Sequence, residues 1–149
     1  MLALLGAVSL RGSRGSRGAI RSGRSAPPRR EDPRLDRVVA GYIEAALWSS
    51  HDDEDNALDA VDAELSEAAK AELRQDCADF LDSCDDADLD LSPIGSGQIG
   101  HDFWLTRNHH GAGFWDRGLG ELGDRLTTLA HAAGGRDLYV SDAGAIEVR

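Results

Sequence analysis

The sequence predicts a small α+β domain, in which an antiparallel four-stranded sheet made of two hairpins packs against about three helices in the order α-α-β-β-α-β-β. Two observations lead to this fold class. Three segments carry apolar residues at spacings of three and four, which is typical of amphipathic helices. Two other segments alternate apolar and polar residues on either side of a turn, as hairpins do. The chain has 149 residues, enough for one hydrophobic core.

The N-terminal segment differs from the rest of the chain in composition. Residues 1–30 contain seven arginines and no acid, with glycine and serine between many of the arginines. Such a segment buries too little apolar surface to offset its loss of conformational entropy. We therefore expect a disordered basic Arg/Gly/Ser-rich leader over residues 1–32 and a single acidic α+β domain over residues 33–149. A non-functional extension is the favoured role of the leader, with a transit peptide and an RNA-binding tract as alternatives.

The charge of the predicted domain limits its partners. Residues 31–149 hold 9 basic and 27 acidic residues, a formal charge of −18. A body with this charge repels a phosphate backbone, so we expect no direct nucleic-acid binding by the domain. No apolar run reaches the roughly 18 residues of a membrane span, and we expect a soluble, cytoplasmic protein without membrane contact. A GC-rich genome explains the excess of aspartate, with salt adaptation and mimicry of nucleic acid as alternatives.

Two helices are expected in the first half of the domain. The first runs from about residue 34 to 49, after Pro33. The second runs from about residue 64 to 84, with one apolar stripe made of Leu65, Ala69, Leu73, Cys77, Phe80, Leu81 and Cys84. Its two cysteines lie two turns apart, about 10 Å along the axis, which is too far for a disulfide. We expect both to be free core thiols in a reducing compartment.

The second half is expected to form two hairpins around a third helix. In residues 101–107, Phe103 and Leu105 alternate with Trp104 and Thr106, which predicts a strand. Turn residues 108–113 and a short partner strand at 114–116 would complete the first hairpin. A helix from about 119 to 133 stops at two glycines, and strands at 138–140 and 145–148 form the second hairpin.

Residues 101–117 hold the densest set of polar and aromatic side chains. If the predicted hairpin forms, an imidazole and a carboxylate on opposite strands can meet and exchange a proton or bind a metal. The candidate catalytic residues are His101, Asp102, His110 and Asp116, and the candidate binding residues are Trp104, Arg107, Asn108, Trp115 and Arg117. A purely structural interpretation explains many of them equally well, with the aromatic rings in the sheet core and Asp116 capping the next helix.

No cofactor is expected from the sequence motifs. Residues 95–100 (GSGQIG) match the dinucleotide fingerprint in letters, but they precede a predicted strand instead of following one. No confident set of metal ligands is visible. A divalent metal held loosely by the acidic loop at residues 52–55 is the alternative, although a solvated loop is far commoner.

Residues 100–108 (GHDFWLTRN) and 110–118 (HGAGFWDRG) resemble a small acidic protein family of bacteriophages and of bacterial and archaeal genomes. The similarity extends from near Tyr42 to the terminal strands and omits the leader. It implies a phage-like or mobile-element setting and carries over no catalytic residue. In the relatives, glycine is expected where this chain has His109.

Three functions are open at this point. The first is a phage-type accessory protein that binds a host or phage protein through its acidic surface. The second is a small metal-dependent or acid–base enzyme that uses the predicted hairpin at residues 101–116. The third is an inhibitor that mimics DNA, which requires acids spaced like phosphates along one face.

Overall fold

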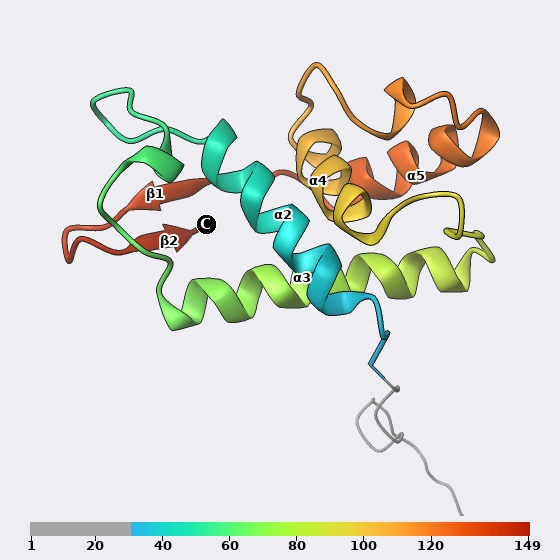
Figure 1. Ribbon diagram of the computed structural model, residues 1–149, viewed down its shortest axis with the longest axis horizontal. Coiled ribbons are helices and arrows are strands. Elements are labelled where there is room, and N and C mark those ends of the chain that lie inside the picture. Colours follow the sequence, from blue (N-terminus) through green and yellow to red (C-terminus); the bar gives the residue numbers. More distant parts are fainter. Residues whose placement is uncertain (1–30) are drawn as a thin grey trace, which may run out of the picture. The chain divides into compact units, whose positions relative to one another are not determined.

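The computed structural model describes residues 31–149, which form one compact unit (Figure 1). Most of the predicted leader therefore lies outside the described residues. The elements in chain order are α2 (Leu35–Ser49), the short 3-10 helix η2 (Leu58–Ala60), α3 (Glu67–Asp86), α4 (Ser96–Arg107), the 3-10 helix η3 (Phe114–Asp116), α5 (Glu121–Ala132), β1 (Leu138–Val140) and β2 (Ile146–Val148). No helix among these residues is long and apolar enough to cross a membrane.

The predicted fold class is wrong in its central part. The described residues hold four α-helices and a two-stranded antiparallel sheet, so the fold is dominated by helices. The three predicted helices correspond to α2, α3 and α5, and the C-terminal hairpin corresponds to β1 and β2. The hairpin predicted at residues 101–116 does not exist: its first strand is the helix α4, and its second strand is η3.

A close helix crossing explains the glycines that precede and begin this region. A Cβ atom on Gly100 would overlap the backbone carbonyl of Val38, and one on Gly41 would overlap the carbonyl of Gly97. The backbones of α2 and α4 therefore touch, which only residues without a side chain permit. The sequence GSGQIG is thus the start of a helix that packs against α2 through Gly97 and Gly100, and the expectation that this segment is a connector to a strand is wrong.

The core is built around α4, which the other helices enclose. All but one of residues Ile99 to Arg107 are buried, including the polar Asp102, Thr106 and Arg107. Aromatic rings from three helices and η3 stack through the centre of the unit. Tyr42 lies 5.1 Å from Phe103, Phe103 lies 4.0 Å from Phe80, and Phe80 lies 5.7 Å from Phe114, all between ring centroids. Because aromatic burial supplies much of the free energy of folding, α4 is the central structural element.

The two cysteines of α3 are buried in this core and free, as predicted. Burial raises the pKa of the Cys84 thiol to about 12, and burial likewise raises the pKa of Cys77 far above its usual range. Both thiols are therefore packing residues and lack the thiolate character of reactive cysteines.

The β-hairpin lies at the opposite end of the unit from η3 and the start of α5 (Figure 1). β1 and β2 pair antiparallel, with Tyr139 opposite Glu147. On its other side, β2 is bridged in parallel to Leu65, just before α3. Ser66 then caps α3, because its hydroxyl accepts a hydrogen bond from the N–H of Ala69. The strand β1 is left at the edge of this small sheet.

Candidate functional site

The first polar cluster on α4 is an ion pair around Asp102. Its carboxylate is fully buried and accepts hydrogen bonds from Arg117 Nη2 at 2.7 Å and Arg117 Nε at 3.0 Å. Gln98 Nε2 donates a third bond at 2.7 Å. The hydrogen bond to Asp102 raises the pKa of the Arg117 guanidinium. Since Arg117 and Gln98 occupy both oxygens of the carboxylate, Asp102 anchors the segment after η3 to α4 and is poorly placed to act as a base.

His101 lies beside this pair, at the surface end of the cluster. Its Nδ1 is 3.8 Å from Asp102 Oδ1, and among the described residues this buried nitrogen has no hydrogen-bond partner. Its Nε2 accepts a hydrogen bond of 3.4 Å from Trp48 Nε1. An accepting Nε2 places the proton of the neutral ring on Nδ1, facing the carboxylate. His101 therefore supports the half-exposed Trp48 indole against α4.

The second cluster joins α4 to the other helices through Arg107. This guanidinium is 5% exposed and donates to the Tyr42 hydroxyl at 2.7 Å and to Asp76 Oδ2 at 3.1 Å. It also donates to the carbonyls of Ala133 at 2.8 Å and Gly134 at 2.6 Å, which lie at the C-terminal end of α5. A cation at this end of a helix satisfies the free carbonyls and complements the helix dipole.

Arg136 and Asn108 complete the second cluster. Arg136 donates to both carboxylate oxygens of Asp76, at 2.9 and 3.0 Å, and these bonds raise the pKa of its guanidinium. Asn108 accepts from the N–H of Arg136 and donates to the carbonyl of Trp104, so it ties the end of α4 to the chain after α5. Every polar group in this cluster has a partner inside the protein, as expected of a structural network.

The four catalytic candidates are not brought together. His101 lies in the first half of α4 and His110 follows its last turn, nine positions later, a rise of about 13 Å if the helix continued. His110 and Asp116 are both exposed, and Asp102 is paired with Arg117. Among the four, the contact found in residues 31–149 is that between His101 and Asp102.

The loop after α4 explains the expected glycine at position 109. His109 has a φ of 58°, in the left-handed region that glycine adopts without strain. Its ring stacks on that of His131 in α5, with centroids 4.3 Å apart. This histidine therefore has a packing role in the present chain.

Four of the five binding candidates are also structural. Trp104 is buried and donates to the Ser49 hydroxyl at 2.9 Å, while Arg107, Asn108 and Arg117 hold the clusters described above. Trp115 is the exception, since 52% of it is exposed. The conspicuous residues 100–118 thus fold one part of the domain onto another, and they leave one aromatic side chain free to contact a partner.

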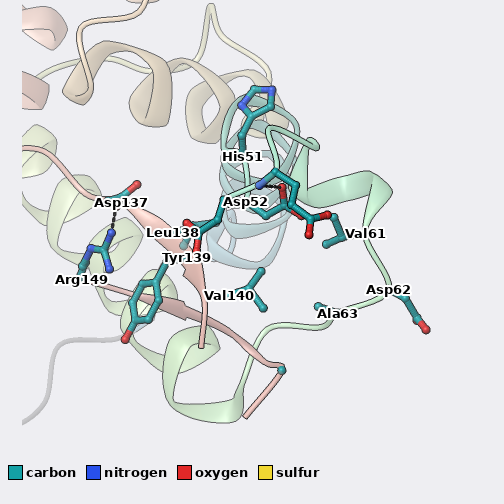
Figure 2. A pocket seen from close by; sticks show the side chains of 13 residues that line it. His51, Asp52, Val61, Asp62, Ala63, Asp137, Leu138, Tyr139, Val140 and Arg149 are labelled. Atoms are coloured by element: carbon teal, nitrogen blue, oxygen red, sulfur yellow. Dashed lines mark hydrogen bonds and ion pairs between the residues drawn. The ribbon is translucent and has the colours of Figure 1, made fainter. Parts of the chain in front are cut away.

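A groove lies elsewhere, beside β1, at a place that no sequence pattern indicated (Figure 2). This groove has a volume of about 430 Å³ and lies between β1 and the chain segment 51–63. Val140 points across it toward the segment that carries Val61 and Ala63, whereas Tyr139 points away (Figure 2). The acidic loop at residues 52–55 is visible in the sequence, but no sequence pattern indicates that it lies beside the terminal hairpin.

The groove is strongly acidic. Five carboxylates line it, those of Asp52, Asp53, Glu54, Asp62 and Asp137. Arg149 is the one arginine or lysine in the lining, and it is paired with Asp137 at 2.9 Å. The lining charge is therefore −4 when His51 is neutral. Carboxylates around a partly apolar hollow favour a ligand with positive charge and some apolar surface.

Backbone hydrogen bonds hold the acidic loop in its conformation. Asp52 Oδ1 accepts from the N–H of Asn56 at 2.8 Å and from the N–H of Glu54 at 2.9 Å. The bond from Asn56 contributes most to lowering the pKa of Asp52. A bridge between His51 and Ala57 closes the loop at its base. The loop therefore presents Asp53 and Glu54 from a fixed backbone.

Within residues 31–149, no three histidine, cysteine, aspartate or glutamate side chains converge as the ligands of a metal ion would. The divalent metal considered from the sequence therefore gains no ligand set here.

Comparisons of the chain with protein-family models, with curated proteins and with solved structures found no match. The resemblance to a phage-type acidic family stays a prediction from residues 100–118.

Proposed function

We propose that this chain is an accessory protein, of the phage type that the resemblance implies, which binds a host or phage protein through its acidic surface. The supporting observation is that most of the basic side chains in the domain are already paired with acids of the same domain. Seven of the nine basic residues in 31–149 form ion pairs within the domain. Residues 31–149 hold 27 acidic and nine basic residues, so carboxylates dominate the surface that a partner would contact.

Binding is favoured over catalysis by the arrangement of the polar side chains. The buried carboxylate of Asp102 and the half-buried carboxylate of Asp76 are each neutralised by arginine, which leaves neither as a free base. Of the remaining catalytic candidates, His110 and Asp116 are exposed, and His101 is half-buried and lies apart from His110. An acid–base enzyme needs its proton donor and acceptor within hydrogen-bond reach of one substrate position, and these residues do not provide it.

Protein binding is also favoured over DNA mimicry. A mimic needs an uninterrupted line of carboxylates spaced like phosphates. The longest acidic element is α3, but Glu72 and Asp76 on it are paired with Arg136, and Lys70 and Arg74 interrupt the series. The line of negative charge is therefore broken.

The proposal is tested by capturing partners from lysate with the full-length chain, identifying them by mass spectrometry and reconstituting the complex from purified components. The dissociation constant should rise with salt, because screening weakens attraction between opposite charges. A reconstituted complex whose affinity does not change with salt would contradict the role of the acidic surface. A lysate that yields no partner at low salt would contradict the binding function.

A further inference from the structure

The strand β1 has one paired edge and one open edge. Asp137 and Arg149 exchange both backbone hydrogen bonds, each 3.0 Å long, and the N–H of Ser141 donates to the carbonyl of Ala145. In an antiparallel ladder the residues bonded to the partner strand alternate. Tyr139, between these two positions, therefore directs its backbone groups toward β2.

It follows that Leu138 and Val140 direct their backbone groups away from β2. The opposite strand confirms this alternation: Ile146 faces Val140, and its N–H and C=O bond outward to Glu64 and Ser66 on the far side of the sheet. Among residues 31–149, no hydrogen bond is made by the N–H or C=O of Leu138 or Val140. Two donors and two acceptors are thus unpaired along this edge, and those of Val140, which is 36% exposed, are accessible, whereas Leu138 is only 2% exposed.

This open edge forms a wall of the acidic groove. Leu138, Tyr139 and Val140 line the same 430 Å³ hollow as Asp53 and Glu54. Val140 is 36% exposed, which makes it one of the few large apolar side chains at the surface of residues 31–149. Three strand residues span about 10 Å, so the groove offers room for a short extended segment.

We propose that an extended, basic segment of the partner protein adds to the free edge of β1 and lies in the groove between β1 and the acidic loop. This inference rests on the proposed function and gives it a binding mode. The segment would form backbone hydrogen bonds with the N–H and C=O of Val140, the way in which strand addition gains affinity. Its basic side chains would face Asp53 and Glu54, and an apolar side chain would cover Val140.

Charge distinguishes this occupant from a second copy of the domain. Proteins guard open strand edges with charged side chains, because an unguarded edge pairs with another copy of itself. Here the guarding charges are the lining carboxylates, which would repel the same carboxylates of a second groove. They attract a segment that carries lysine or arginine, so the edge is closed to self-association and open to a basic strand.

A short synthetic peptide of alternating lysine and valine is the probe, and its affinity for the full-length chain is measured by calorimetry. Two isomers of the peptide, N-methylated on either all lysines or all valines, have the same charge but block opposite edges of an extended strand. One isomer should bind at least about tenfold more weakly than the other, because it has lost its donors to β1. Equal affinities for the two isomers would overturn strand addition.

Variants of the protein test both sides of the groove. Val140→Pro removes the free N–H without changing charge, and an edge strand tolerates proline where that N–H is unused. It should weaken binding about tenfold with an unchanged circular dichroism spectrum. The double variant Asp53→Asn, Glu54→Gln should weaken binding about three- to tenfold. The matched control Glu44→Gln, Asp88→Asn removes two exposed carboxylates elsewhere and should leave affinity nearly unchanged.

Failure of this binding mode is distinguishable from failure of the proposed function. If both double variants lower the affinity for the peptide equally and Val140→Pro leaves it unchanged, the acidic surface binds the peptide but the β1 edge is not used. That outcome overturns strand addition and leaves the proposed function standing. A dimer in sedimentation analysis that Val140→Pro abolishes would assign the edge to a second copy and also overturn the inference.

Discussion

Because α2 and α4 are in close contact, alanine substitutions at two glycines of α4 should change the free energy of unfolding in opposite directions. In Gly100→Ala the new methyl group would overlap the backbone carbonyl of Val38. Overpacking costs about 1–3 kcal/mol when side chains can give way, and here the obstacle is backbone, so we take the upper end. Alanine returns about 1 kcal/mol through helix propensity. The net loss in the free energy of unfolding is about 2 kcal/mol.

The matched variant is Gly97→Ala, one turn earlier in the same helix. A Cβ atom at this position meets no other atom within 4 Å, so the added methyl group is free of overlap. Helix propensity alone should then stabilise the protein, by up to about 1 kcal/mol. The two variants add the same atoms, and their unfolding free energies should differ by about 3 kcal/mol.

Urea denaturation followed by circular dichroism measures both variants. With a slope of about 2 kcal/mol per molar urea, the midpoint of Gly100→Ala should fall by about 1 M, and that of Gly97→Ala should stay the same or rise. Two variants of equal stability would mean that α4 does not cross α2 at Gly100. The helical assignment of residues 96–107 would then lose its main packing argument.

Three further predictions concern the buried polar groups. Arg117→Met should lower the free energy of unfolding by about 2 kcal/mol in urea denaturation, because it leaves the Asp102 carboxylate buried without its cation; an unchanged midpoint would mean that water already serves this carboxylate. Tyr42→Phe should cost about 1–3 kcal/mol in the same assay, because the phenol both donates to Asp76 at 3.0 Å and accepts from Arg107 at 2.7 Å. Burial raises the pKa of Tyr42, so ultraviolet titration of the folded protein should leave this phenol protonated at pH 11. Burial also raises the pKa of Cys84 to about 12 and that of Cys77 further, so a thiol reagent at pH 8 should label neither until the protein unfolds, and rapid labelling would contradict their burial.

The elements that the sequence predicts correctly are those with one buried face. In α3, Leu73, Cys77 and Phe80 recur at helical spacing because solvent covers the opposite side. The terminal hairpin is recognisable because turn residues separate two short apolar runs. In both cases the pattern of apolar residues reports burial directly.

The helix α4 was not predicted, because it is buried on nearly all sides and therefore has no single apolar face. Its polar residues Asp102, Thr106 and Arg107 are inside the protein, where partners from other elements satisfy them. The alternation of apolar and polar residues in this helix does not reflect burial, but it has the same period as the pattern of a half-buried strand. The one usable signal was the spacing of Gly97 and Gly100, which suits two helix backbones in close contact.

The candidate site was missed for a related reason. The polar residues concentrated in and after α4 suggested a site, but their charged side chains form ion pairs within the fold. The groove combines residues from three separate segments, among them Asp53, Val61 and Val140, and no spacing along the chain reveals that they meet. The free edge of β1 is a property of backbone pairing and leaves no mark on side-chain patterns.

Hydrogen exchange at β1, measured by NMR on the full-length chain with and without the lysine–valine peptide, tests the central claim most directly. In the free protein the amide of Val140 should exchange quickly while that of Tyr139, bonded to β2, exchanges slowly. The peptide should slow exchange at Val140 and leave Tyr139 unchanged. Saturation with peptide that leaves the exchange of Val140 as fast as before would contradict binding at the free edge of β1.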